Sequence, residues 1–274
     1  MAFPKVKILV CTHKKALCLT DDIYMPIQVG RVEVDYDLGF QTDLTGDNIG
    51  DKHFTYSEYT GIYWAWKNLK NVDYIGWCHY RRYFCLNNGK EYNRETLIIK
   101  EDDLFKFDFS TNSLKSYLSE YDIILPIKRV FPSSVWDVMK RCHDNRDLKI
   151  TEEILQNMYP EYMPTFNKYL KNTNRLEQLS VFITKWEIFD NYCKWLFSIL
   201  FEIEKRADIL NNSIHTERKI AFIAEQLSSV YYHHNKLKIK HLPVAWVNPN
   251  AKNKSWFRYH ASNIKSTFRY WFNV

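Results

Sequence analysis

The sequence predicts an α/β fold built on a mostly parallel sheet. Short apolar runs typical of buried strands recur along the chain, and segments with apolar residues at helical spacing lie between them. Several of these runs end in polar or charged residues. In an open sheet of this kind, ligands bind beyond the carboxyl ends of the strands. The residues that follow each predicted strand are therefore candidates for a functional site.

The composition is typical of a folded protein with a sizeable core. Of the 274 residues, 46% are hydrophobic and 16% aromatic, whereas Gly and Pro number only 7 and 8. The 6 cysteines include no Cys-x-x-Cys pair and suit reduced, buried thiols. Residues 1–15 lack a secretory signal, and the most apolar later stretch, residues 195–201, is too short to cross a bilayer. We therefore expect a cytoplasmic protein.

The first part of the chain is predicted to alternate between strands and a helix. Residues 5–11 form a first, central strand, and residues 28–34 form a second. After a polar loop over residues 42–53, Thr55 and Glu58 have the spacing of a capping box, which predicts a helix start and explains Glu58 as a cap. Apolar residues then recur at helical spacing.

The rest of the chain is predicted to be mainly helical, with three further strands. Those strands are residues 121–127, 181–184 and 238–247. The helices are expected near residues 112–118, over much of 133–172, and at 188–206 and 218–232. We expect one domain over residues 1–250, followed by a helical, basic and aromatic tail over residues 251–274.

The strand predicted at residues 74–78 ends in the most distinctive segment of the chain. It continues as His79-Tyr80-Arg81-Arg82. Adjacent arginines between aromatic residues are costly to bury unless an anion pairs with them. Guanidinium groups match phosphate oxygens, so we expect Arg81 and Arg82 to bind a diphosphate, with His79 beside them. The alternative is two surface arginines that lie over neighbouring tyrosines.

This segment belongs to a longer pattern that resembles a known family. Residues 56–68 read YSEYTGIYWAWKN, and residues 73–84 read DYIGWCHYRRYF. In this pattern the chain is similar to the bacterial capsular and exopolysaccharide synthesis glycosyltransferases long catalogued as a domain of unknown function. Further matches, in order within residues 5–247, are residues 11–14, 28–30, 46–49 and 189–200, His143 with Asp147, and Arg218 with Glu225. Ser180 departs from the asparagine expected there.

The resemblance implies a GT-A-like fold and a hexosyltransferase. The donor would be a nucleotide-diphosphate sugar, UDP-linked, and some relatives point to galactose or galactofuranose as the sugar. The acceptor would be a glycan carried on a polyprenyl diphosphate, in capsular or exopolysaccharide synthesis. Such an enzyme would work at the inner face of the cell membrane.

Two further groups of polar residues are candidates for binding the donor. Thr12, His13 and Lys14 follow the first strand, where they could contact the base and the phosphates or only begin a polar loop. Asp47 and Asn48 could hydrogen-bond to the ribose or the base, but beside a glycine they are equally good turn formers.

An inverting transfer needs a group that takes the proton of the acceptor hydroxyl. His143 and Asp147 lie four residues apart and could share a helix face. Glu225 lies in an otherwise apolar helix, where it could act as the base or form an ion pair with Arg218. We rank Asp147 ahead of Glu225 and His143, and retention of configuration stays open.

No metal or other cofactor is expected. Many GT-A enzymes hold a metal with Asp-x-Asp after a strand, and here basic residues follow the corresponding strand. Cationic side chains can stabilise the charge that grows on a diphosphate leaving group. Asp35 and Asp37 form the only Asp-x-Asp of the sequence, and we interpret them as solvated residues of a turn.

The tail has the pattern of an interfacial helix. Residues 252–274 include five Lys and Arg and no Asp or Glu, and their large apolar residues share one face at helical spacing. These apolar residues are Phe257, Ile264, Phe268, Trp271 and Phe272. The pattern predicts binding to an anionic membrane surface. The alternative is a helix docked on the core.

The rival function is a nucleic-acid-binding module that uses the basic, aromatic tail with Arg81 and Arg82. The net charge of +6 is compatible with either function. A nucleic-acid groove would need a continuous basic stripe, whereas these arginines lie deep in the α/β pattern. We therefore expect no nucleic-acid partner.

Overall fold

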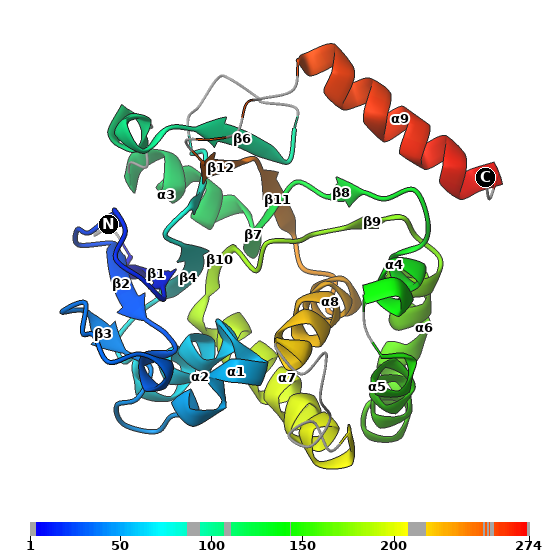
Figure 1. The fold of residues 1–274 in the computed structure, drawn as a ribbon, viewed down its shortest axis with the longest axis horizontal. Coiled ribbons are helices and arrows are strands. Elements are labelled where there is room, and N and C mark those ends of the chain that lie inside the picture. Colours follow the sequence, from blue (N-terminus) through cyan, green and yellow to red (C-terminus); the bar gives the residue numbers. More distant parts are fainter. Residues whose placement is uncertain are drawn as a thin grey trace.

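A mixed sheet forms the centre of the protein (Figure 1). The computed structural model describes residues 4–86, 94–106, 111–142, 144–207, 218–248, 250, 252 and 255–272, and within these ranges ten strands join the sheet. Seven of them follow in the order β11 (Ile239–Leu242), β7 (Ile123–Pro126), β10 (Phe182–Lys185), β4 (Tyr74–His79), β1 (Val6–Thr12), β2 (Tyr24–Gln28) and β3 (Gln41–Thr42). The other three are β5 (Arg82–Phe84), β12 (Val244–Val247) and β6 (Thr96–Ile99).

The direction of the strands gathers several carboxyl ends at one edge. β1 is parallel to both β2 and β4, and β2 is parallel to β3. β10 runs antiparallel between β4 and β7, and β5 turns back from the end of β4 to pair with β12. A separate two-stranded sheet joins β8 (Arg129–Val130) to β9 (Arg175–Leu176). The residues that follow β1, β2 and β4 therefore meet at the same edge of the sheet.

Helices cover both faces of the sheet (Figure 1). They are α1 (His53–Tyr56), α2 (Tyr59–Asn68), α3 (Thr111–Glu120), α4 (Val135–Cys142), α5 (Asn145–Met158), α6 (Met163–Phe166), α7 (Trp186–Ala207), α8 (Lys219–His234) and α9 (Trp256–Phe272). Short 3₁₀ turns occupy Arg31–Glu33, Gly50–Lys52, Glu101–Lys106 and Pro160–Tyr162, and a π-helical turn occupies Asn167–Lys171. The predicted α/β fold is confirmed.

Alternate residues of β1 supply the two halves of the hydrophobic core. Leu9 and Cys11 are buried with α2, α7 and α8 on one face. Ile8 and Val10 are buried on the other face, in a cluster that also holds residues of β12 and α3. Both faces of this strand are covered, which is why it reads as a nearly continuous apolar run.

Two predicted strands are corrected by the structure. The second strand is β2 and ends at Gln28, because Gly30 turns the chain with a φ of 68° into a 3₁₀ turn. The single last strand is in fact β11 and β12, separated at Pro243, and they pair with different neighbours. A proline cannot donate to the ladder, so the run breaks there.

The predicted capping box is also wrong. α1 ends at Tyr56, Ser57 adopts a φ of 47°, and α2 begins at Tyr59. Glu58 precedes α2, but its side chain makes no capping hydrogen bond. The break between the two helices leaves the Glu58 carboxylate available for another role.

Close packing between α2 and the sheet depends on Gly61. A Cβ atom at this position would lie 2.5 Å from Cη2 of Trp77 and 2.8 Å from Cγ1 of Val29. We predict that Gly61→Ala lowers the stability by about 1–3 kcal/mol, because overpacking outweighs the better helix propensity of alanine. Chemical denaturation measures the change. An unchanged or raised free energy of unfolding would contradict this packing.

Candidate active site

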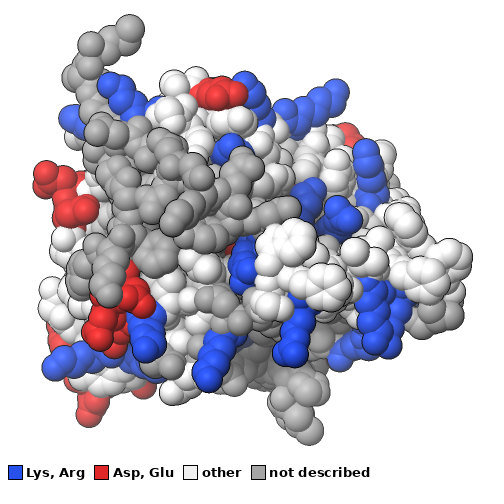
Figure 2. All heavy atoms as spheres, turned by 90° about the horizontal axis from the view of Figure 1, so that it is seen from above, with Lys and Arg blue, Asp and Glu red and all other residues white. Residues whose placement is uncertain are grey.

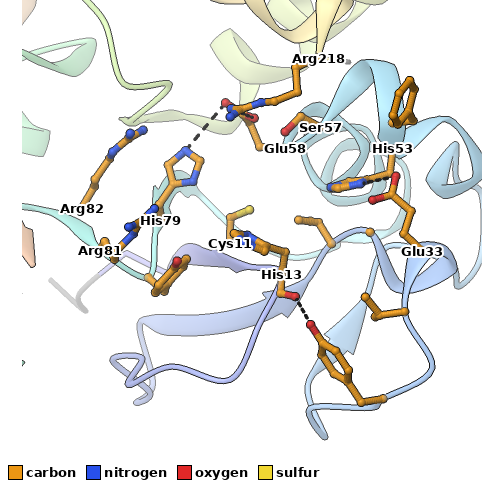
Figure 3. A pocket seen from close by; sticks show the side chains of 16 residues that line it. Cys11, His13, Glu33, His53, Ser57, Glu58, His79, Arg81, Arg82 and Arg218 are labelled. Carbon is orange, nitrogen blue, oxygen red and sulfur yellow. Dashed lines mark hydrogen bonds and ion pairs between the residues drawn. The ribbon is translucent and has the colours of Figure 1, made fainter. Parts of the chain in front are cut away.

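A cavity of about 320 Å³ opens at the carboxyl edge of β1, β2 and β4 (Figure 3). His13 follows β1, Glu33 follows β2, and His79 ends β4. Arg81 lies in the turn between β4 and β5, and Arg82 is the first residue of β5. The remaining polar lining comes from the helical side of the cavity: His53, Ser57, Glu58 and Arg218. Segments that are far apart in the sequence thus build one polar cavity.

Three arginines give the cavity a positive character. Arg81 stacks on the Tyr80 ring, with Cζ 5.0 Å from the ring centre. Within the part of the chain that the structure describes, neither Arg81 nor Arg82 forms an ion pair with a carboxylate. The third, Arg218, precedes α8 in a left-handed conformation, and its backbone N–H donates to the Phe54 carbonyl at 2.8 Å.

Glu58 is the carboxylate inside this cationic group. It is only 6% exposed. Nη2 of Arg218 donates to its Oε2 at 3.3 Å, and Nε2 of His79 lies 3.9 Å from its Oε1. Burial alone would raise the pKa of Glu58, but His79 and Arg218 outweigh burial and lower it. Glu58 is therefore charged near neutral pH and compensates part of the positive charge.

His79 is neutral near physiological pH. Burial and the neighbouring arginines lower its pKa to about 4, against the opposing effect of Glu58. Its Nε2 is buried and makes no hydrogen bond with the described residues, and the same is true of the Tyr80 hydroxyl. Buried polar atoms are normally paired. Two such atoms at the cavity are consistent with a site that takes up a polar ligand.

Glu225, on α8, lines a separate, smaller cavity with Ser180, and its charge interacts with that of Arg82. Its Oε1 accepts hydrogen bonds from the backbone N–H of Leu179 at 2.7 Å and from Oγ of Ser180 at 3.4 Å. Burial, and then the charge of Glu58, raise its pKa, although Arg82 acts in the opposite direction. Leu179 and Ser180 both have positive φ angles, 86° and 47°. Strained non-glycine residues of this kind concentrate at functional sites.

The structure brings together only some of the predicted donor residues. His13, His79, Arg81 and Arg82 all line the cavity. Thr12 is buried at the end of β1, where its hydroxyl donates to the Lys14 carbonyl at 2.6 Å. Lys14 is exposed and does not line the cavity.

Asp47 and Asn48 lie in the loop before α1, away from the cavity lining. Oδ1 of Asp47 accepts from the Tyr63 hydroxyl at 3.2 Å. The Asn48 amide donates to the Leu44 and Gly46 carbonyls. These bonds are those of turn formers, and a contact with the donor stays a prediction.

Asp147 is held in a buried ion pair. Its Oδ2 lies 2.9 Å from Nζ of Lys219, and both side chains are almost fully buried. Asp147 does not line the cavity. Its predicted partner His143 lies outside the described residues. Glu225 does not line the cavity either, but its charge interacts with that of Arg82, which does, and this favours Glu225 over Asp147 as a group near a bound substrate.

Sequence reasoning missed several residues of the cavity. Glu58 and Arg218 pair with each other although they lie 160 residues apart. The sequence had suggested a helix cap for Glu58 and an ion pair with Glu225 for Arg218. His53 lies on the opposite side from Arg82, with Nδ1 2.9 Å from Oε1 of Glu33 (Figure 3). No local pattern indicates the pair of His53 and Glu33. The sequence feature that could have indicated Glu58 as a site residue is its position inside the motif of residues 56–68.

The described residues contain no group of three or more His, Cys, Asp and Glu side chains that could hold a metal ion. Asp37 accepts a hydrogen bond from the Gly39 N–H at 2.7 Å and so stabilises a turn. This hydrogen bond is that of a turn residue, and the expectation that no metal binds there stays a prediction.

Comparisons with known proteins identify a family and a similar solved structure. The family described as a domain of unknown function, DUF4422, matches residues 7–236. The apo structure of the bifunctional glycosyltransferase WbbM is similar over 92% of this chain, with a TM-score of 0.80 and 28% sequence identity. The match covers 48% of that protein, so the chain spans about half its length. No curated protein matches the chain.

The raised pKa of Glu225 predicts that the stability of the protein depends on pH. Because its pKa is raised in the folded protein, its contribution to stability is complete below the unfolded-state pKa and is lost as the pH rises through the raised value. Glu225→Gln stays neutral and can still accept the two hydrogen bonds. We predict that its melting temperature, relative to wild type, rises between about pH 5 and about pH 8. Thermal melts at both values check this, and a constant or falling difference would contradict the raised pKa.

Proposed function

Because the chain belongs to the DUF4422 family, we propose that it is a glycosyltransferase that uses a nucleoside diphosphate sugar as its donor. Its mixed α/β fold is GT-A-like. The observation that carries the proposal is the cavity where Arg81, Arg82 and Arg218 meet beyond the ends of parallel strands. A diphosphate bound there would neutralise a cationic group that Glu58 compensates only in part.

The arginines would act on the leaving group. Transfer breaks the bond between the anomeric carbon and the diphosphate oxygen, and the electron pair stays on the diphosphate. Guanidinium groups fixed beside that oxygen stabilise the charge that grows on it. Arg81 and Arg82 are suited to this role because they have no carboxylate partner among the described residues.

Glu225 is our candidate for the base in a single-displacement transfer. Its carboxylate would take the proton of the acceptor hydroxyl while that oxygen bonds to the anomeric carbon. A raised pKa makes a carboxylate a better proton acceptor, and Glu225 lies beside Arg82. Asp147 is less suited because Lys219 holds it in an ion pair.

We further propose a lipid-linked glycan as acceptor, a hexose such as galactose or galactofuranose as the transferred sugar, and UDP as the nucleotide. In the described residues no helix is both long and apolar enough to cross a membrane. α9 offers a peripheral contact instead. It has no buried residue, and its six large apolar side chains are between 54% and 74% exposed. They are Trp256, Phe257, Ile264, Phe268, Trp271 and Phe272.

We predict that Arg82→Ala lowers turnover by on the order of 10²-fold or more, because it removes a fixed cation from the leaving group. Arg81→Ala should behave in the same way. Both variants should also lose the rise in melting temperature that UDP gives the wild type. Near-wild-type rates in both variants would contradict the diphosphate role. A larger rise with single-stranded oligonucleotides than with UDP would favour a nucleic-acid-binding module.

We predict that activity persists in EDTA, because the arginines supply the positive charge that the leaving group needs. Transfer assays with and without the chelator, followed by addition of Mn²⁺ or Mg²⁺, measure this. Complete loss in EDTA that either ion restores would contradict it. The phosphate site would then have to include carboxylates such as Asp35 and Asp37.

We predict that α9 binds anionic liposomes. Arg258, Lys265 and Arg269 flank its apolar side chains, and Figure 2 shows Lys and Arg side chains beside uncharged ones on the side of the molecule where α9 lies. Each basic residue near an anionic surface contributes about 1 kcal/mol. Replacing all three with Gln should therefore weaken binding by about 10²-fold, and so should high salt.

Sedimentation with phosphatidylserine-containing and neutral liposomes measures this binding. Removal of residues 252–274 should release the protein and reduce activity on a lipid-linked acceptor more than on a soluble one. A truncated protein that still sediments would contradict the membrane role of α9. A truncated protein that unfolds would support a docked helix.

A further inference from the structure

We propose that a groove leading from Arg82 to the inner face of α9 binds the acceptor glycan, and that Trp246 is the platform for one of its sugar rings. This inference rests on the proposed function and names a second subsite for it. Two adjoining cavities, of about 290 Å³ and about 380 Å³, form the groove. They share Glu95, Thr96, Arg129 and Trp246 in their walls.

The groove shares one wall residue with the cavity that contains Arg81, Arg82 and Arg218, which we call the donor cavity. Arg82 lines both the donor cavity and the nearer part of the groove. In the antiparallel pairing of β5 with β12, Trp246 stands directly opposite Arg82. Directly opposed residues project from the same face of a sheet, with Cβ atoms about 4.5–5.5 Å apart. A partly exposed indole ring therefore lies next to the guanidinium that would hold the leaving group.

The chemistry of the groove suits a sugar chain. A half-buried tryptophan offers an apolar face to the C–H groups of a sugar ring. Hydroxyl and amide groups that match sugar hydroxyls come from Tyr259, Asn263 and Ser266 on α9. Arg129 donates to the Gln178 side chain at 3.3 Å, and both line the groove. The same walls also carry the charged residues Arg94, Glu95, Arg129 and Lys252, so charged groups accompany the neutral ones in the groove.

The candidate base lies just behind the groove wall. Leu179 lines the nearer part of the groove, and its backbone N–H donates to Oε1 of Glu225 at 2.7 Å. A sugar ring on Trp246 would thus lie near both Arg82 and the segment that holds Glu225. Proton transfer to Glu225 requires that the acceptor hydroxyl lie close to this carboxylate during attack on the donor.

The position of α9 explains how a lipid-linked glycan could enter. The face of α9 toward the groove carries Asn263 and Ser266, whereas Ile264 and Trp271 are exposed on the helix. If the exposed side chains lie in the lipid interface, the far end of the groove opens at the membrane surface. The glycan of a lipid-linked acceptor would then extend from there toward Arg82.

The test measures sugar binding and nucleotide binding separately. Saturation-transfer NMR would probe the protein with the methyl glycosides of glucose, galactose, mannose, rhamnose and N-acetylglucosamine. UDP binding would be followed by the rise in melting temperature. We expect the wild type to bind at least one glycoside. Trp246→Ala should weaken that binding about tenfold or more, whereas Trp246→Phe should keep most of it.

A second variant avoids any disturbance of the sheet. Asn263→Trp fills the groove from α9 and should also abolish glycoside binding. Trp271→Ala is the matched control, since it removes an exposed tryptophan from the same helix and should leave glycoside binding unchanged. UDP should stabilise all four variants as it does the wild type.

The proposal is overturned if no glycoside binds the wild type, or if binding survives both Trp246→Ala and Asn263→Trp. It is also overturned if Trp246→Ala abolishes UDP binding, because Trp246 would then belong to the donor cavity. If UDP fails to stabilise the wild type while a glycoside binds in the groove, the proposed donor chemistry fails and the glycan subsite stands.

Discussion

The concentration of positive charge at one edge of the sheet is the constraint on which the site depends. Arg81 lies in the turn after β4, Arg82 begins β5, and Arg218 directly precedes α8. Arg82 is half-buried, whereas Arg81 and Arg218 are exposed, and cations gathered in this way attract an anion. Glu58 provides one carboxylate, held by Arg218 and close to His79. It can reach that position because the chain breaks between α1 and α2, and because Gly61 lets α2 pack closely on Trp77.

The carboxylates of Glu58 and Glu225, which both interact with this cationic group, have different environments. Arg218 and His79 lower the pKa of Glu58, whereas burial and the charge of Glu58 raise the pKa of Glu225. Neighbouring acids whose pKa values are driven apart often have different functions. In our account Glu58 stays charged and orients the cations, while Glu225 exchanges a proton. Leu179, whose backbone N–H donates to Glu225, lines the groove that contains Trp246.

Much of the fold could be predicted from the sequence, because buried strands and amphipathic helices have distinct apolar patterns. The cluster of His79, Arg81 and Arg82 was found in the same way, since it directly follows such a strand. The errors arose where a local pattern competes with a distant contact. Glu58 matches a capping box locally, yet its partners are Arg218 and His79. Pairings across many residues, such as Asp147 with Lys219 or Trp246 opposite Arg82, leave no mark in a single sequence.

A crystal structure with UDP bound would test the central claim most directly. Our account predicts that the two phosphates lie within hydrogen-bonding distance of the Arg81 and Arg82 guanidinium groups, beyond the ends of β1 and β4. It also predicts that the groove beside Trp246 stays free of nucleotide. A nucleotide bound elsewhere, or one whose phosphates contact neither arginine, would contradict the account.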